Sequence, residues 1–396
     1  MTASPRFSQR VIQVPNSGIG FMMRYAAKYP DVVSLGQGTP LFPTPQFIFD
    51  ELYRRSQIDA ELGMYSGTKN ELPLKEQIIK QMSRIYGFSP SSKQIYLTMG
   101  GIAGLFSAFM SFLEEGDEVI YFDPSYPLHL SQIHLTGAKL IFVAYREETG
   151  WTLDLERLAK AITPKTKAII LTNPNNPTGT VLSQAEVRSL ADLVVEHNLI
   201  LILDEAYEFL TYEKQLYSPL KIPELRDRTV LCKSFSKEFA MTGWRIGYIF
   251  ASEEIVAKIN DVHTYFSISP ATPSIVAATI ALSDPRGEQA TAGFKEKFTQ
   301  SRKAICDRLD NLPRLFSYHK PEGAYYAFPK IIGLPMPSFD FAKLLVDEAR
   351  VITIPGSAMG PAGEGHLRMS FAADPQVIHR AFDRIDAFAK KYNLFG

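Results

Sequence analysis

Lys237 stands where a lysine can do chemistry. It lies between two short apolar runs, residues 230–232 and 246–250, and Arg245 follows it by eight residues. A lysine held between two buried strands is partly desolvated, so it loses its proton more easily and can act as a nucleophile. A solvated lysine in a short polar loop explains this stretch equally well. Residues elsewhere in the chain have to distinguish the two interpretations.

Short apolar runs, separated by helical patterns, position Lys237 and its neighbours. They are rich in Val, Ile and Leu, as buried strands are. Strands that alternate with helices predict an α/β fold, with a large domain whose mainly parallel sheet is covered by helices on both faces. The predicted strands are residues 95–98, 118–122, 140–143, 168–171, 199–203, 229–232 and 245–250.

Four of these strands are followed by residues that could bind or react. Ligands bind beyond the carboxyl ends of parallel strands, so we expect these residues to meet in one crevice. Ordinary loop polarity could explain any one of these segments, but it would have to explain all four of them separately. The segments are Gly100–Gly101, Thr172–Gly179, Asp204–Tyr207 and Lys233–Lys237.

Two glycine turns and one arginine favour an anionic ligand. Gly100–Gly101 precedes a predicted helix, where backbone N–H groups suit a phosphate, although such turns also occur without one. Gly38 allows close approach of the backbone or belongs to a plain linker. Arg368 lies in the apolar run 366–371, where an unpaired guanidinium is costly. It should therefore meet a carboxylate, either from the protein or from a ligand.

The length of 396 residues predicts more than one domain. We expect an N-terminal segment, 1–45, that joins the smaller domain, a large α/β domain, 46–290, and a small C-terminal α+β domain, 291–396. Residues 291–396 mix helices and strands, with fewer of the alternating strand–helix units that predict a parallel sheet. Its predicted elements are a helix at 291–312, a strand at 321–328, a helix at 339–350, strands at 351–354 and 366–371, and a helix at 375–392.

Composition excludes several classes of partner. The 42 basic and 42 acidic residues cancel, which argues against nucleic acid or an anionic membrane and favours small molecules or other proteins. Only Cys232 and Cys306 are present, so we expect no disulfide framework and no metal site. No apolar run has the length of a signal peptide or a membrane span. We expect a soluble, unprocessed, cytoplasmic protein.

Taken together, these segments resemble the class I/II aminotransferases. These are aspartate-aminotransferase-like, pyridoxal-phosphate-dependent enzymes of fold type I. The resemblance extends from about Ser34 to Ser370, and it implies that the large domain binds pyridoxal 5'-phosphate. The motifs that carry it are Asn173–Gly179, Asp204–Tyr207, Ser234–Lys237 with Met241–Gly247, and His366–Arg368.

The resemblance implies three catalytic residues. Lys237 would form the Schiff base with the cofactor and, once displaced by the substrate amine, move the proton between the substrate α-carbon and the cofactor. Asp204 would pair with the pyridine nitrogen and keep it protonated. Tyr207 would hydrogen-bond the ring hydroxyl together with Asn176.

The remaining contacts are likewise implied by the resemblance. Tyr126 would stack on the ring, and Arg368 would bind the substrate carboxylate, assisted by Gly38 and Asn176. Tyr65 matches a tyrosine that reaches the phosphate from the neighbouring subunit, which implies an obligatory homodimer with shared active sites. The phosphate would be held by Gly100, Gly101, Ile102, Ser234 and Arg245.

The expected activity is transfer of an amino group from an amino acid to a 2-oxo acid, through the Schiff base and the pyridoxamine form of the cofactor. A C–S β-lyase, or another pyridoxal-phosphate enzyme on the same scaffold, is the alternative, because it shares the Schiff base and the removal of the α-proton. A cofactor-binding regulatory protein is the least favoured interpretation. Residues 18–23 and the aromatics near Tyr325 favour a substrate with a neutral or aromatic side chain.

Overall fold

The computed structural model describes residues 7–12, 14, 17–40 and 42–394, so parts of the predicted segments 1–45 and 291–396 lie outside it. Its centre is a seven-stranded sheet. Neighbouring strands run parallel, except that one strand, residues 247–250, is antiparallel to both of its neighbours. The predicted mainly parallel sheet is therefore confirmed. The strand order is β2 (Ile95–Thr98), β8 (Gly247–Phe250), β7 (Thr229–Ser234), β6 (Ile200–Asp204), β5 (Thr166–Thr172), β3 (Glu118–Asp123), β4 (Lys139–Ala144).

Helices cover both faces of this sheet, as the sequence predicts. Successive side chains of a strand point to opposite faces, and on β6 Leu201 packs into one core while Ile202 packs into the other. On the Ile202 side lie α5 (Gly101–Phe112) and α10 (Glu253–Phe266), and on the Leu201 side lies α8 (Gln184–Glu196). Burial on both faces explains why the strands are almost continuously apolar.

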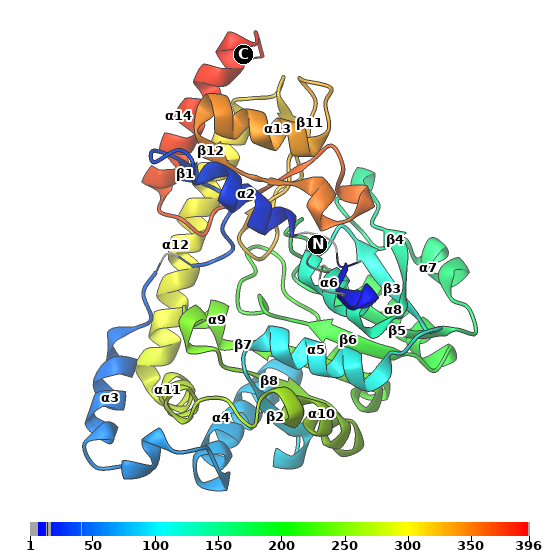
Figure 1. Ribbon diagram of the computed structural model, residues 1–396, viewed down its shortest axis with the longest axis vertical. Helices are drawn as coiled ribbons and strands as arrows, with labels where there is room; N and C mark the ends of the chain where they lie inside the picture. Colours follow the sequence, from blue (N-terminus) through cyan, green and yellow to red (C-terminus); the bar gives the residue numbers. More distant parts are fainter. Residues whose placement is uncertain (1–6, 13, 15–16, 41, 395–396) are drawn as a thin grey trace, which may run out of the picture.

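The other helices of this part lie around the sheet (Figure 1). Three of them pack together at the lower end of the molecule: α3 (Gln46–Ser56), α4 (Thr68–Tyr86) and α11 (Thr272–Ser283). Two more follow individual strands, α6 (Pro127–Thr136) after β3 and α7 (Leu155–Ala161) after β4.

The N-terminal and C-terminal residues fold together at the opposite end (Figure 1). β1 (Val33–Ser34) pairs in parallel with β12 (Val351–Ile352), and α2 (Gly18–Ala26) contacts α13 (Ser338–Leu344). This contact joins segments more than three hundred residues apart in the sequence. The other elements here are the sheet β10 (Tyr326–Ala327), β14 (Leu367–Ser370), β13 (Ile354–Pro355), the pair β11 (Lys330–Ile331), β9 (Phe316–Ser317), and the helix α14 (Pro375–Lys391).

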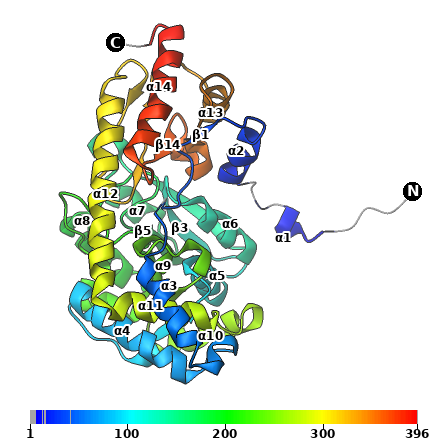
Figure 2. The ribbon, with the colours of Figure 1, turned by 90° about the vertical axis from the view of Figure 1, so that its left-hand side faces the viewer.

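One helix runs along both parts of the molecule. Figure 2 shows α12 (Pro285–Asp310) extending from α11 to the level of α14. It begins earlier than the helix predicted at 291–312, because Asp284 caps it: the Asp284 side chain accepts a hydrogen bond of 2.9 Å from the Arg286 backbone N–H. The predicted boundary between residues 290 and 291 falls inside this helix, and the domain division stays a prediction.

The strand predicted at 321–328 is much shorter in the structure. Only Tyr326–Ala327 pairs as a strand, opposite Ser370 and Met369. Ala324 has a φ of 55°, in the left-handed region, so the chain turns before the strand can begin. Among the residues that the structure describes, no helix is long and apolar enough to cross a membrane.

Candidate active site

A cavity of about 380 Å³ lies beyond the carboxyl ends of β5, β6 and β7. Its size suits a small ligand. All four predicted strand-end segments contribute residues to its lining, although Gly101 is the one residue from the first segment. Tyr65 and Gly100 do not line it; Tyr65 is 79% exposed in this chain. The predicted residues in the lining are Gly38, Gly101, Ile102, Tyr126, Asn176, Asp204, Tyr207, Ser234, Lys237, Arg245 and Arg368.

Lys237 lies on a one-turn helix, α9 (Phe235–Glu238), rather than in the polar loop that the sequence suggests. Ser234 begins this helix, and its hydroxyl accepts a hydrogen bond from the Ser236 backbone N–H. The Lys237 amine donates to the Gly38 carbonyl oxygen over 2.6 Å. Burial and the nearby positive charge of Arg368 lower the pKa of Lys237 to about 8. The structure thus favours the desolvated amine over the solvated loop lysine.

Asp204, at the end of β6, is held by a histidine that the sequence did not single out. Its Oδ2 lies 3.1 Å from Nε2 of His129, and its Oδ1 accepts a hydrogen bond from the Ala206 backbone N–H. His129 is fully buried on α6. It stands three residues after Tyr126, and the two rings meet edge to face at 5.3 Å. That helical spacing was the one available sequence signal.

One end of the cavity is built to hold an anion. Gly100 precedes α5 with a φ of 77°, and a Cβ there would lie 2.6 Å from the Arg245 guanidinium, so only glycine fits. At Gly101 a Cβ would lie 3.3 Å from the Ser234 side chain. The start of a twelve-residue helix, an arginine and a serine side chain therefore converge. This arrangement suits the predicted phosphate.

Arg368 is 1% exposed and has no carboxylate partner among the described residues. Its Nη2 donates to the Gly36 carbonyl over 2.7 Å, and its Nη1 donates to Oδ1 of Asn176 over 3.3 Å. Its Nε has no hydrogen-bond partner in the described part of the chain. A buried guanidinium with unused donors is costly unless an anion meets it. Of the two predicted sources of a carboxylate, the geometry favours a ligand.

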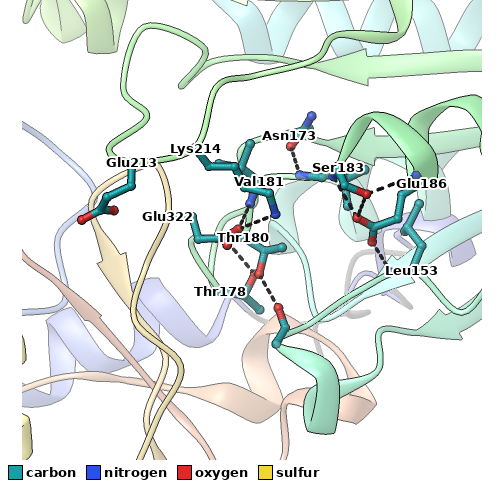
Figure 3. Close-up of polar contacts among 12 residues, drawn as sticks. Leu153, Asn173, Thr178, Thr180, Val181, Ser183, Glu186, Glu213, Lys214 and Glu322 are labelled. Carbon is teal, nitrogen blue, oxygen red and sulfur yellow. Dashed lines mark hydrogen bonds and ion pairs between the residues drawn. The ribbon is translucent and has the colours of Figure 1, made fainter.

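The segment that carries Asn176 is fixed by hydrogen bonds at both of its ends (Figure 3). Asn173 Oδ1 accepts from the Leu182 backbone N–H over 3.1 Å. Ser183 and Glu186 form a capping box that begins α8. Glu322 accepts from the Val181 backbone N–H and from Lys214. The contact between Val181 and Glu322 ties this segment to the turn that precedes β10.

Two tyrosines of the cavity region were noted in the sequence only as neighbouring aromatics. The Tyr325 hydroxyl donates to the Gly38 carbonyl over 2.8 Å. The Tyr326 hydroxyl lies 2.8 Å from that of Tyr207, and Tyr326 lines the cavity. A Cβ at Gly38 would lie 2.4 Å from the Tyr326 hydroxyl. Gly38 therefore leaves space for the Tyr326 side chain, and its carbonyl accepts hydrogen bonds from Lys237 and Tyr325.

Comparison with known proteins shows the family of this chain. Residues 30–385 match the family model described as aminotransferase class I and II. The chain is 34% identical to aromatic-amino-acid aminotransferase 2 of Thermococcus litoralis, over 98% of this chain and 99% of that protein. It is 33% identical to aspartate aminotransferase of Pyrococcus horikoshii, over 96% of each. A solved Pyrococcus structure, described as protein-A1, has a TM-score of 0.92 at 35% identity and covers 97% of this chain and 99% of its own. The chain is therefore an enzyme of the class I and II aminotransferase family.

Proposed function

We propose that this enzyme is a pyridoxal-phosphate-dependent aminotransferase that moves the amino group of an L-amino acid to a 2-oxo acid. The observation that carries the proposal is a partly buried amine, Lys237, in the same cavity as a buried guanidinium, Arg368, that pairs with no carboxylate among the described residues. An amine that loses its proton near neutral pH and a buried guanidinium that can bind a carboxylate are the two groups that amino-acid chemistry needs.

The residues present fit the cofactor. Arg245, Ser234 and the start of α5 would hold its phosphate, and Asp204 would hold its ring nitrogen. Tyr207 and Asn176 would donate to its ring oxygen. Bound pyridoxal phosphate supplies an electron-withdrawing ring that stabilises negative charge on the substrate α-carbon. Tyr126, which packs edge-on against His129, would lie against that ring.

Lys237 and Arg368 would act on different parts of the substrate, the α-proton and the α-carboxylate. Arg368 would bind the α-carboxylate with its two outer nitrogens and so orient the α-carbon toward the lysine. The Lys237 amine, with a pKa of about 8, can accept a proton near neutral pH and return it. The Gly38 carbonyl accepts a hydrogen bond from this amine, and both residues line the cavity.

The cavity favours a neutral or aromatic substrate side chain. Its lining contains four cations among the described residues, and each has an assignment: Lys233 pairs with Glu208, Lys237 is the base, Arg245 faces the phosphate end and Arg368 binds the α-carboxylate. None is left for a second carboxylate. Ile19 and Leu128 add apolar surface. The relatives' printed names include both aromatic and aspartate aminotransferases, so substrate choice needs its own test.

A half-reaction panel tests activity and substrate together. Purified enzyme loaded with pyridoxal phosphate should lose its visible absorbance on adding tyrosine or phenylalanine, and a 2-oxo acid should restore it. We expect aspartate to react at least about ten times more slowly, because none of the cations that line the described cavity is left to pair with its second carboxylate. Rapid reaction with aspartate alone would contradict the side-chain preference. Release of ammonia and pyruvate from a cysteine-type substrate would favour the β-lyase.

We also propose that the active site is shared within a homodimer. Tyr65 is 79% exposed, Met64 next to it is 63% exposed, and Ile58, seven residues before it, is 76% exposed. So many exposed large side chains are unusual in one short stretch of sequence. We retain the proposed smaller domain formed by 1–45 and 291–396, supported by the β1–β12 pair.

The cytoplasmic location is likewise a proposal. It is supported by Cys232 and Cys306, which are both free thiols, as is usual in a reducing compartment.

Mixed dimers test the sharing directly. Lys237→Ala and Tyr65→Ala homodimers should both be impaired, whereas a hybrid of the two contains one site with an intact lysine and an intact partner tyrosine. The hybrid should therefore regain about half of the activity per dimer. A hybrid no more active than the mean of its parents would show that Tyr65 acts within its own chain or not at all.

A further inference from the structure

The Tyr326 hydroxyl is a buried polar group of the cavity that the roles above do not use. Tyr326 is 1% exposed, on β10, and its hydroxyl oxygen lies 2.8 Å from that of Tyr207. Either oxygen could be the donor in this pair. A buried hydroxyl beside a residue expected to contact the cofactor can influence the chemistry without touching it.

The position of Tyr326 is fixed from three sides. Its register opposite Ser370 places it on the same face of the strand pair as Arg368, whose guanidinium lies 4.7 Å from the centre of the Tyr326 ring. The Tyr207 ring stands nearly perpendicular to it, at 86°. Gly38 leaves room for the Tyr326 hydroxyl, because a Cβ at position 38 would lie 2.4 Å from it. The preceding turn is tied to the Asn173–Ser183 segment through Gly323 and Glu322 (Figure 3).

The charges around the pair give the hydrogen bond a direction. Burial raises the pKa of both tyrosines, so both keep their protons near neutral pH. The positive charge of Arg368 opposes this rise at Tyr326, which makes Tyr326 the better donor. Two hydroxyls carry two hydrogens, and only one can lie between the oxygens. If Tyr326 supplies it, the Tyr207 hydrogen stays available for an acceptor in the cavity.

We propose that Tyr326 is a positioning residue: it donates to the Tyr207 oxygen and thereby directs the Tyr207 hydroxyl hydrogen into the cavity, toward the ring oxygen of pyridoxal phosphate. This inference rests on the proposed function. A hydrogen bond donated to that ring oxygen draws electron density from the nitrogen that bonds the cofactor to Lys237, and so lowers the pKa at which this nitrogen loses its proton. Tyr326 strengthens that donation through a chain of two hydrogen bonds.

The test is a pH titration of the visible absorbance of the cofactor-loaded enzyme. Tyr326→Phe removes one hydroxyl and keeps the ring, and the titration midpoint should move upward by about half a unit or more. Tyr212→Phe is the matched control, because its hydroxyl donates to the Ala324 carbonyl over 2.8 Å and does not line the cavity. The control should leave the midpoint unchanged, although both variants lose one partly or fully buried hydrogen bond.

A second pair of variants distinguishes action through Tyr207 from direct action. Tyr207→Phe should raise the midpoint more than Tyr326→Phe does, and adding Tyr326→Phe to it should produce no further shift. Gly38→Ala provides an independent route, since the new methyl group displaces the Tyr326 hydroxyl and should also raise the midpoint. It keeps the test decisive if Tyr326→Phe fails to fold.

Two results would overturn this inference while leaving the proposed function intact. One is an unchanged midpoint in both Tyr326→Phe and Gly38→Ala while the wild-type enzyme titrates normally. The other is a full additional shift in the Tyr207→Phe background, which would show that Tyr326 acts independently. A wild-type chain that forms no visible band with pyridoxal phosphate would overturn the proposed function, and this inference with it.

Discussion

Replacing Lys237 with alanine should lower turnover by about four orders of magnitude while leaving pyridoxal phosphate bound. The proposed cofactor contacts at Arg245, Ser234 and Asp204 do not involve the lysine, whereas the proton at the substrate α-carbon would have no other acceptor among the residues with a proposed role. With a pKa of about 8, about a tenth of Lys237 is unprotonated at pH 7. An ordinary lysine would be unprotonated in only about three molecules in ten thousand.

Single-turnover absorbance measurements separate binding from chemistry in this variant. Lys237→Arg should lose activity to a similar extent, because a guanidinium keeps the charge but cannot give up its proton. Lys160→Ala is a matched control at a largely exposed lysine, which pairs with Glu156, and should be unaffected. Near-normal turnover of Lys237→Ala would refute the role assigned to this residue.

Replacing Arg368 should weaken productive binding of the substrate carboxylate. We expect Arg368→Leu to lower kcat/KM for amino acids by about a hundredfold to a thousandfold, which is the usual loss when one partner of a buried charged pair is removed. Arg368→Lys should recover only part of it, because a lysine supplies the charge without the planar pair of donors. The cofactor absorbance should persist in both variants.

A substrate without the carboxylate provides the control. The wild-type enzyme should prefer an amino acid strongly over the amine that lacks its carboxyl group, and Arg368→Leu should lose most of that preference. If the variant discriminates between the two as well as the wild type does, Arg368 does not bind the substrate carboxylate. Its burial would then be a structural feature supported by Gly36 and Asn176.

Several features of the site were predictable because their signals are local. Strand ends, glycine turns and helix starts depend on neighbouring residues, so Asp204 at the end of β6 and the Ser183–Glu186 capping box could be located from the chain alone. The strand predicted at 245–250 begins only at Gly247, since Arg245 adopts a left-handed φ of 52°. A single residue's backbone angle is not encoded in an apolar pattern.

The sequence by itself determined the series of buried strands, the position of Lys237 after one of them, and the need of Arg368 for a carboxylate. These follow from hydrophobic periodicity and from the cost of burying charge, which act over a few residues. The tertiary structure decided which groups meet. His129 reaches Asp204 across 75 residues, and Tyr326 reaches Tyr207 across 119. Such contacts depend on how separate elements pack, and a hydroxyl or an imidazole carries no local sign of its distant partner.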